Sequence, residues 1–319
     1  MAAPFARDVY SRRHHFLPVF YLKGFTGPQE TFHVYDKLED RILESQSPKS
    51  KYFEKHLNNY KFDGEIKFTL EESYFTPVDS TAAPLFLKIR EDSFNENTLT
   101  ALDKFQILHF LMVLFWRLPG SNEKTKELIK KEGVSNRYLG MFDYDRQLND
   151  EEVADIAEKF LQDEMYVSLY KSVIPMLEGP RLEIFNLFDK WNVFTLPAGM
   201  QPLVTGDAPL LIKNDNFNLD HILGELIFPL SHNRLLILSD KVPKFLDFSL
   251  NKVVNLAILD QSKRYISCQH LGYLQYLIDE FKKIKSIGAD GRGLKVVFDH
   301  LHYQAGFNSH REYMDRNKN

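Results

Sequence analysis

The sequence is poor in cysteine and in long apolar segments, and both absences limit what the chain can be. Its single cysteine, Cys268, cannot form a disulfide within the chain or supply a cysteine-rich zinc site. The strongest apolar run, residues 107–116, is interrupted by His109 and is too short to cross a bilayer. The N-terminus lacks the apolar core of a signal peptide. We therefore expect a cytoplasmic protein without a membrane partner.

Motifs that identify common enzyme classes are also absent. The sequence has no glycine-rich phosphate loop, no Gly-x-Gly-x-x-Gly, no His-Glu-x-x-His and no Gly-x-Ser-x-Gly. Glycines do cluster at residues 288–293, but no Lys-Ser or Lys-Thr follows them, so this segment is predicted to be a loop. These absences argue against nucleotide hydrolysis by a P-loop and against serine-hydrolase chemistry on a nucleophile elbow.

The composition that remains is that of a globular protein with an aromatic core. Hydrophobic residues make up 44% of the 319 residues, and the 26 Phe and 15 Tyr can fill a large core. The net charge of −4 argues against a nucleic-acid binder held by charge alone, although Arg12, Arg13 and Lys23 could form a local basic groove. Because no repeat or low-complexity linker divides the chain, we expect one domain, residues 1–319.

Residues 1–190 are expected to be mainly helical. The polar residues 36–40 lie between two short runs of strand-forming residues and predict a β-hairpin. The segment Thr76-Pro77-Val78-Asp79 combines the spacing of a capping box with proline at the first helical position, so a helix should begin there. Pro84 should kink or restart this helix, because a proline inside a helix removes a hydrogen bond.

Two further helices begin at recognisable caps. A second capping box, at residues 100–103, opens a helix that should end at Leu118-Pro119-Gly120. Because this helix is apolar nearly all round, we expect it in the middle of the core. Asn149 is the predicted cap of another helix, which has an apolar stripe along one side.

The pattern changes in residues 191–319, which are expected to form a sheet and the C-terminal helices. Short runs broken by Pro, Gly, Asn and Asp predict strands of an antiparallel sheet. These runs are residues 191–196, 202–205, 210–213, 226–229 and 234–238. Helical spacing returns at 250–268 and 271–284, and the polar C-terminal end should be frayed. This order predicts an α+β fold, with central buried helices packed with a mostly antiparallel sheet.

Two adjacent histidines, His14 and His15, are the first candidate site residues. Neighbouring side chains of an extended segment point to opposite sides, so at most one of the two enters a given pocket. That histidine could act as a general base near neutral pH or as a metal ligand. The alternative is structural, with a ring nitrogen that satisfies backbone groups beside the turn at Pro18.

The helix that begins near Thr100 carries polar residues along one line. Successive residues turn by about 100°, so Gln106, His109 and Arg117 share one side of a helix that should otherwise be buried. A buried arginine must be paired or bind an anion. Arg117 is therefore a candidate anion-binding or catalytic residue with His109 beside it. Alternatively, Arg117 complements the dipole at the C-terminal end of the helix and reaches solvent.

Two acids and an arginine complete the set of candidates. Asp207 lies in Thr205-Gly206-Asp207-Ala208-Pro209 at the end of a predicted strand, where a loop on a rigid sheet favours a functional carboxylate. Aspartate close to proline is also ordinary turn chemistry. The capping box by itself accounts for Asp79, and Arg264 could cap the end of a helix. Asp79 and Arg264 are kept as binding candidates.

The opening segment resembles the signature of a bacterial family of unknown function, domain-of-unknown-function family 4238. The resemblance is carried by His14-His15-Phe16-Leu17-Pro18-x-x-Tyr21-Leu22-Lys23-x-Phe25. It continues through residues 72–89, 110–119, 203–209, 228–231 and 255–264, nearly the whole chain. It implies that His14 or His15, Arg117 and Asp207 lie in signature segments, and Tyr21 and Lys23 become binding candidates. The resemblance supplies no activity.

The chain departs from the pattern expected for this family at two positions. Asp79 stands where we expect Glu. Leu114, one turn before Arg117, stands where we expect a polar Gln.

Two functions remain open on the sequence alone. If His14 or His15, Arg117 and Asp207 converge, a histidine base, an arginine for developing negative charge and an orienting carboxylate suit a hydrolase, in particular a nuclease or phosphodiesterase acting on nucleic acid. Histidine with carboxylates could instead hold a divalent metal. The alternative is a non-catalytic binding or regulatory module in which the same residues are structural.

Overall fold

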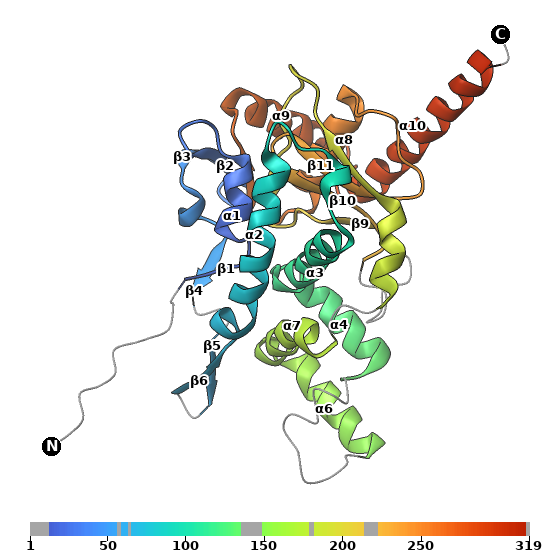
Figure 1. The fold of residues 1–319 in the computed structure, drawn as a ribbon. Helices are drawn as coiled ribbons and strands as arrows, with labels where there is room; N and C mark the ends of the chain where they lie inside the picture. The colour runs from blue at the N-terminus through green and yellow to red at the C-terminus, as the bar shows by residue number, and fades with distance from the viewer. Residues whose placement is uncertain are drawn as a thin grey trace.

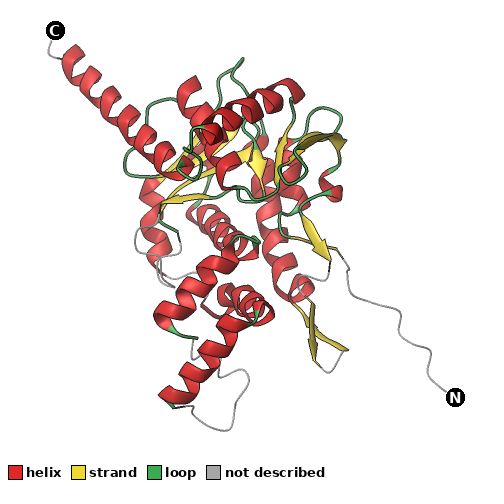
Figure 2. Cartoon of the chain, turned by 180° about the vertical axis from the view of Figure 1, so that it is seen from behind, coloured by secondary structure: helices red, strands yellow, loops and turns green. Residues whose placement is uncertain are grey.

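The computed structural model describes residues 13–55, 59–62, 65–134, 149–178, 182–213 and 223–316. Figure 1, and Figure 2 from behind, show the two four-stranded sheets at one end of the molecule, above helix α3, with α4, α6 and α7 farther away. Helix α10 projects outward from the sheet-bearing end. Helices combined with antiparallel sheets confirm the predicted α+β fold. Among the described helices, none has the length and apolar character needed to cross a membrane.

The helices follow the local signals of the sequence where those signals are strong. The α-helices are α1 (Val19–Leu22), α2 (Thr76–Arg90), α3 (Ala101–Arg117), α4 (Ser121–Glu132), α6 (Asp150–Gln162), α7 (Glu164–Glu178), α8 (Phe248–Gln261), α9 (Leu271–Ser286) and α10 (Gly293–Arg316). Turns of 3-10 helix are Lys23–Phe25, Pro48–Ser50, Glu96–Thr98 and Leu182–Lys190, and a π-helical turn is Glu71–Phe75. The capping box predicted at Thr100 forms with Asp103 as the reciprocal partner, and the cap predicted at Asn149 also forms, in a capping box with Glu152.

All described strand pairs are antiparallel. The first four-stranded sheet has the order β7 (Trp191–Thr195), β11 (Arg234–Leu238), β10 (Glu225–Ser231) and β9 (Leu211–Lys213). The second has the order β3 (Arg41–Gln46), β2 (Phe32–Asp36), β12 (Tyr265–Cys268) and β8 (Thr205–Gly206). Two smaller pairs are β1 (Arg13–His15) with β4 (Phe53–Lys55), and β5 (Asn59–Phe62) with β6 (Glu65–Thr69). The second sheet therefore joins strands from both ends of the chain.

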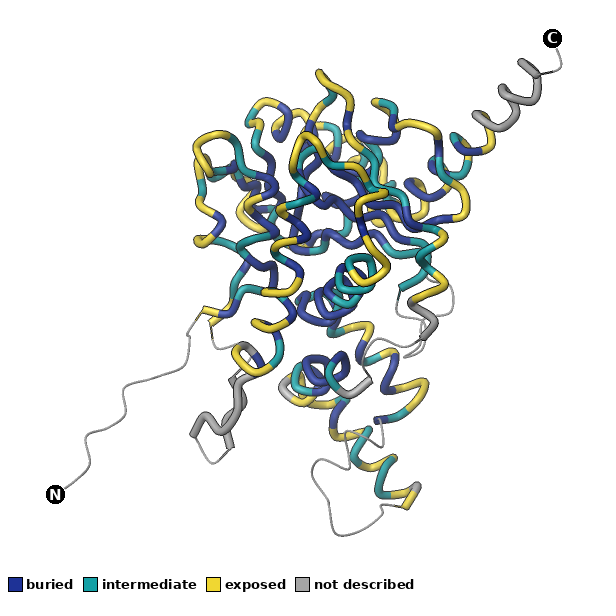
Figure 3. Tube along the Cα trace, viewed as in Figure 1, coloured by how far each residue is buried: buried dark blue, intermediate teal, exposed yellow. Residues whose placement is uncertain are grey.

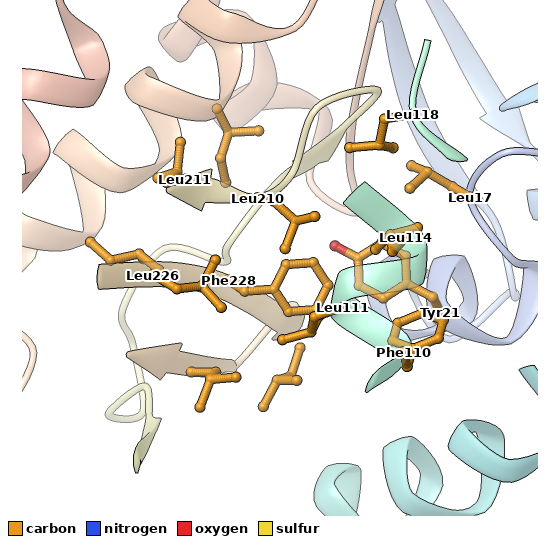
Figure 4. Close-up of a cluster of buried hydrophobic side chains, with 14 of the residues drawn as sticks. Leu17, Tyr21, Phe110, Leu111, Leu114, Leu118, Leu210, Leu211, Leu226 and Phe228 are labelled. Atoms are coloured by element: carbon orange, nitrogen blue, oxygen red, sulfur yellow. The ribbon is translucent and has the colours of Figure 1, made fainter. Parts of the chain in front are cut away.

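The core lies where α3 meets the sheets and the opening segment (Figure 3). Figure 4 shows Phe110, Leu111 and Leu114 of α3 packed with Tyr21 and with Phe228 of β10. Leu114 is fully buried in this cluster. Burying a leucine side chain contributes about 1.5–3 kcal/mol. This apolar gain gives a physical reason for a leucine where the family pattern led us to expect glutamine.

The predicted capping box at Thr76 is not present. The residue before α2, Phe75, is itself in a helical conformation, because the π-helical turn Glu71–Phe75 runs directly into the helix. No side chain caps this end, and the carboxylate of Asp79 is bonded to Arg117 instead. Helix α2 also continues through Pro84, because its buried residues on both sides of the proline pack in the core.

Three further boundaries differ from the prediction. The segment 250–268 is not one helix: α8 ends at Gln261, and Tyr265–Cys268 form strand β12, which pairs with β2. Of the predicted run 202–205, only Thr205 lies in a strand, which is the two-residue β8. Helix α10 packs against α8 and is helical as far as Arg316, whereas the last residues of the end predicted to fray, 317–319, lie outside the described residues.

Candidate functional site

Arg117 joins three elements of the fold. Its side chain is 2% exposed, and its Nη1 donates to Asp79 Oδ1 of α2 at 2.8 Å. Its Nη2 donates to the carbonyl oxygen of His15 in β1 at 2.9 Å, and the guanidinium lies 4.6 Å from the ring centroid of Phe75. Arg117 therefore does not extend to solvent at the end of α3, and a carboxylate of this chain supplies the anion that its burial requires.

The two histidines differ in burial, as their places in a strand predict. His14 is fully buried in β1, in register with Glu54 of β4. His15 is half-buried, and its ring lies 5.5 Å from the ring of Phe53. The backbone of His15 is what binds Arg117. Arg12, which the sequence suggested for a basic groove, lies outside the described residues.

His109 lies two turns before Arg117 on α3 but has a different partner. Its Nε2 is 3.3 Å from the hydroxyl of Tyr74, which donates to the carbonyl oxygen of Pro175 at 2.9 Å. Burial lowers the pKa of His109. Through Tyr74, His109 of α3 is linked to the π-helical turn and to α7. His109 and Arg117 thus share one helix, as the sequence indicated, but each has its own contact.

Asp207 forms the centre of a second bonded group. Its Oδ1 accepts the backbone N–H of Lys263 at 2.8 Å, and its Oδ2 accepts those of Arg264 at 2.7 Å and Tyr265 at 3.1 Å. Burial raises the pKa of the Asp207 carboxyl, while the three backbone N–H groups oppose that shift. A β-carbon at Gly206 would collide with the Ser262 side chain, which explains the glycine before this aspartate.

Arg264 and Lys37 complete the second group. Arg264 donates through Nε and Nη2 to Asp36 Oδ2 at 3.1 and 3.0 Å. Asp36 Oδ1 in turn accepts the N–H of Leu38 in the β2–β3 turn. The end of α8 is bound by Lys37, not by Arg264 as one interpretation of the sequence had it. Arg264 therefore holds the hairpin β2–β3 against β12.

Buried or half-buried cations bind the C-terminal ends of four helices. Each ammonium or guanidinium donates to a carbonyl oxygen at or just after the last turn of a helix, where the intrahelical hydrogen bonds run out. The four pairs are Arg90 with Phe20 O of α1 (2.6 Å), Arg234 with Ile89 O of α2 (3.1 Å), Lys171 with Leu118 O after α3 (3.2 Å) and Lys37 with Leu259 O of α8 (2.7 Å). Burial lowers the pKa of Lys171 to about 8 and that of Arg90 to about 10. These cations are part of the scaffold.

Tyr21 connects the opening signature to the two later signature segments. Its hydroxyl is 2.9 Å from Thr205 Oγ1 and donates to the carbonyl oxygen of Pro229 at 3.1 Å. Its ring stacks on Phe228, with centroids 5.2 Å apart, and Figure 4 shows its oxygen amid apolar side chains. Burial raises the pKa of Tyr21. Lys23, the other binding candidate of this segment, is exposed.

Sequence reasoning missed one buried side chain that orders the same region. Asn255 of α8 accepts the N–H of Val204 at 3.0 Å and donates to the carbonyl oxygen of Pro202 at 3.0 Å and to the hydroxyl of Tyr273 at 2.9 Å. The only signal in the sequence is an asparagine within an apolar helical run, and this signal does not name the partners.

Two pockets open on the surface beside α8. The pocket between α8 and α9, of about 470 Å³, is lined by Phe248, Asn251, Lys252, Gly272, Tyr273 and Tyr276, among others. The pocket between α8 and α10, of about 330 Å³, is lined by polar groups and by three aromatic rings. In it Ser249 Oγ lies 2.9 Å from His300 Nε2, and Gln304 bonds to both His300 and Asp247. No predicted site residue lines either pocket.

The structure thus gathers five of the predicted residues into two bonded groups. Arg117, Asp79 and the backbone of His15 form one, and Asp207, Arg264 and their partners form the other. The described part of the chain contains no group of three or more His, Cys, Asp or Glu side chains placed to hold a metal ion.

Comparison with known proteins assigns a family without an activity. Residues 13–269 match the model of a family described as "Protein of unknown function (DUF4238)". No curated protein and no solved structure matches the chain significantly. The matched segment contains both bonded groups and α8, whereas α9 and α10 follow it. Because this match spans well over half of its length, the chain belongs to the DUF4238 family.

Proposed function

We propose that this chain is a ligand-binding module in which the signature residues build the scaffold and the α8–α9 pocket takes the ligand. The observation that carries the proposal is the set of bonds around Asp207, whose carboxylate accepts three backbone N–H groups. Use of this buried carboxylate in catalysis would take the acceptor away from these N–H groups, at up to about 1–3 kcal/mol for each donor that stays shielded from water. A scaffold role explains the same bonds without that cost.

The Arg117 group supports the same interpretation. An arginine that stabilises a substrate anion needs donors directed at that anion. Arg117 instead directs Nη1 at Asp79 and Nη2 at the backbone of His15. Releasing Arg117 toward a substrate would separate a pair of which one member is 2% exposed. Such a separation is strongly unfavourable in a protein interior.

The α8–α9 pocket has the character of a binding site. Its volume lies within the range of small-molecule sites, which are mostly apolar with a few fixed polar groups. Phe248 of α8 and Tyr276 of α9 line it and are 65% and 44% exposed. The buried amide of Asn251 supplies a fixed polar group. Large exposed aromatic rings around a pocket are typical of contact with a ligand.

Filling the pocket tests this proposal. A β-carbon added at Gly272 would meet no atom within 4 Å, so Gly272→Leu should occupy the pocket without disturbing the core. Gly306→Leu on α10 is the matched control, because it also has no atom within 4 Å. The measurement is the melting temperature with nucleoside monophosphates, monosaccharides or aromatic carboxylates. We expect at least one class to stabilise the wild type and the control but not Gly272→Leu; equal responses in all three proteins would refute the assigned pocket.

A hydrolase is the second candidate, favoured by Ser249 and His300 in the α8–α10 pocket. Ser249 Oγ could attack an ester carbonyl while His300 Nε2 accepts its proton and passes it to the leaving oxygen; water then releases the acyl group by the same route. A fluorophosphonate probe should label Ser249, and Ser249→Ala should abolish the labelling while Ser286→Ala preserves it. An unlabelled Ser249 in the wild type would remove this candidate.

A further inference from the structure

We infer that the α8–α9 pocket recognises a planar heteroaromatic ring bearing an anionic group, which is the chemistry of a nucleotide, either free or within a single strand. This inference rests on the proposed binding function and adds the class of ligand. Three features of the pocket carry it: flat aromatic surfaces, a fixed amide and an ammonium group at the rim.

The aromatic side chains provide the flat surface. Tyr273 and Tyr276 stack on each other, with ring centroids 6.0 Å apart and an angle of 22° between the rings. Tyr273 is nearly buried, so it supports Tyr276 from within the fold. Phe248 brings a second exposed ring to the pocket from α8. Aromatic side chains on two elements favour a ligand with a flat π-face, as in the stacking of nucleobases.

Asn251 provides a hydrogen-bonding group whose orientation is fixed. Its Nδ2 donates to the carbonyl oxygen of Gln201 at 2.7 Å, which leaves Oδ1 to act as an acceptor. That oxygen receives one long contact, 3.5 Å from Asn255 Nδ2. An amide oxygen has two lone pairs, so one is left for an N–H of the ligand. The edge of a nucleobase offers such donors.

Lys252 provides positive charge at the rim. Its ammonium bonds to Glu280 at 2.5 Å and lies 5.1 Å from the ring centroid of Tyr276. Glu280 also accepts from Lys283 at 2.8 Å, so two ammonium groups share one carboxylate and the trio has a net charge of +1. An ammonium has three donors, and an anionic group beside the stacked ring would complete its bonds.

The ligand class is tested by calorimetric titration of the full chain with AMP, adenosine and ribose 5-phosphate. We expect AMP to bind, adenosine to bind more weakly and ribose 5-phosphate to give no heat. Phe248→Ala should lower the affinity for AMP by about tenfold or more, because it removes a stacking surface. Lys252→Met should lower the affinity for AMP to about that of adenosine. The affinity for adenosine should not change. Phe245→Ala and Lys295→Met, on exposed side chains outside the pocket, are the matched controls.

The outcomes separate the ligand class from the proposed function. One outcome is that AMP does not bind, whereas a monosaccharide or an aromatic carboxylate binds and Gly272→Leu abolishes that binding. The nucleotide inference is then overturned and the binding function stands. If no probe depends on Gly272, both fall. A hexamer of deoxyadenosine distinguishes the sources: tighter binding than AMP indicates a strand, and weaker binding indicates a free nucleotide.

Discussion

Asp79→Ala is expected to lower the free energy of unfolding by about 3–5 kcal/mol, because it leaves the charge of Arg117 buried without its carboxylate. The side chain of Arg117 is 2% exposed, so its charge is poorly hydrated once the carboxylate is removed. The bond from Nη2 to the carbonyl oxygen of His15 remains, but it carries no compensating charge. Urea denaturation at neutral pH measures the loss.

A double-variant cycle separates the lost pair from the lost side chain. Arg117→Met should lower the free energy of unfolding by less than Asp79→Ala does. Asp79 is 20% exposed, so its carboxylate can be hydrated once the arginine is gone. The combined variant should be more stable than the sum of the two single losses implies, since no charge is then left buried. Strictly additive losses would show that the two groups do not interact in the folded chain.

Asp207→Ala is expected to lower the free energy of unfolding by about 2–3 kcal/mol, because three backbone N–H donors of a partly buried contact lose their acceptor. These donors belong to Lys263, Arg264 and Tyr265, where the chain passes from α8 into β12. The loss should therefore loosen the pairing of β12 with β2 and β8. Thermal and urea denaturation both measure it.

Asp207→Asn is the matched control for shape. The amide retains one acceptor oxygen but turns an NH₂ group toward at least one of the three donors. The stability of Asp207→Asn should therefore lie between that of the wild type and that of Asp207→Ala. The scaffold role would be contradicted if Asp207→Asn were as stable as the wild type but had lost an activity or its stabilisation by a ligand.

The parts of the fold that the sequence predicted correctly depend on local signals. Thr100 was recognised from a capping box, which involves residues three positions apart, and Asn149 from its place before an apolar helical stripe. The same spacing misled the prediction at Thr76, where the π-helical turn continues into α2 and Asp79 faces α3. Strand β12 was missed because its four residues follow a helix closely and become a strand by pairing with β2.

The candidate residues were identifiable from the sequence, but their partners were not. Of the two interpretations left open for Arg117, the structure shows the buried cation that needs an anion, yet its partner Asp79 lies 38 residues away in the chain. The amides that bind Asp207 lie 56 to 58 residues after it. Such contacts depend on how the elements pack, which periodicity and capping do not encode. The α8–α9 pocket had no signal at all, since it arises from two helices brought together.

The most direct test of the scaffold role is hydrogen exchange at three amides of the wild-type chain, those of Lys263, Arg264 and Tyr265. If the Asp207 carboxylate holds them as an internal acceptor, they should exchange only through large-scale unfolding, as slowly as the amides of the neighbouring core strands. Fast exchange at these three amides under native conditions would show that the carboxylate is available for other partners and would contradict the account.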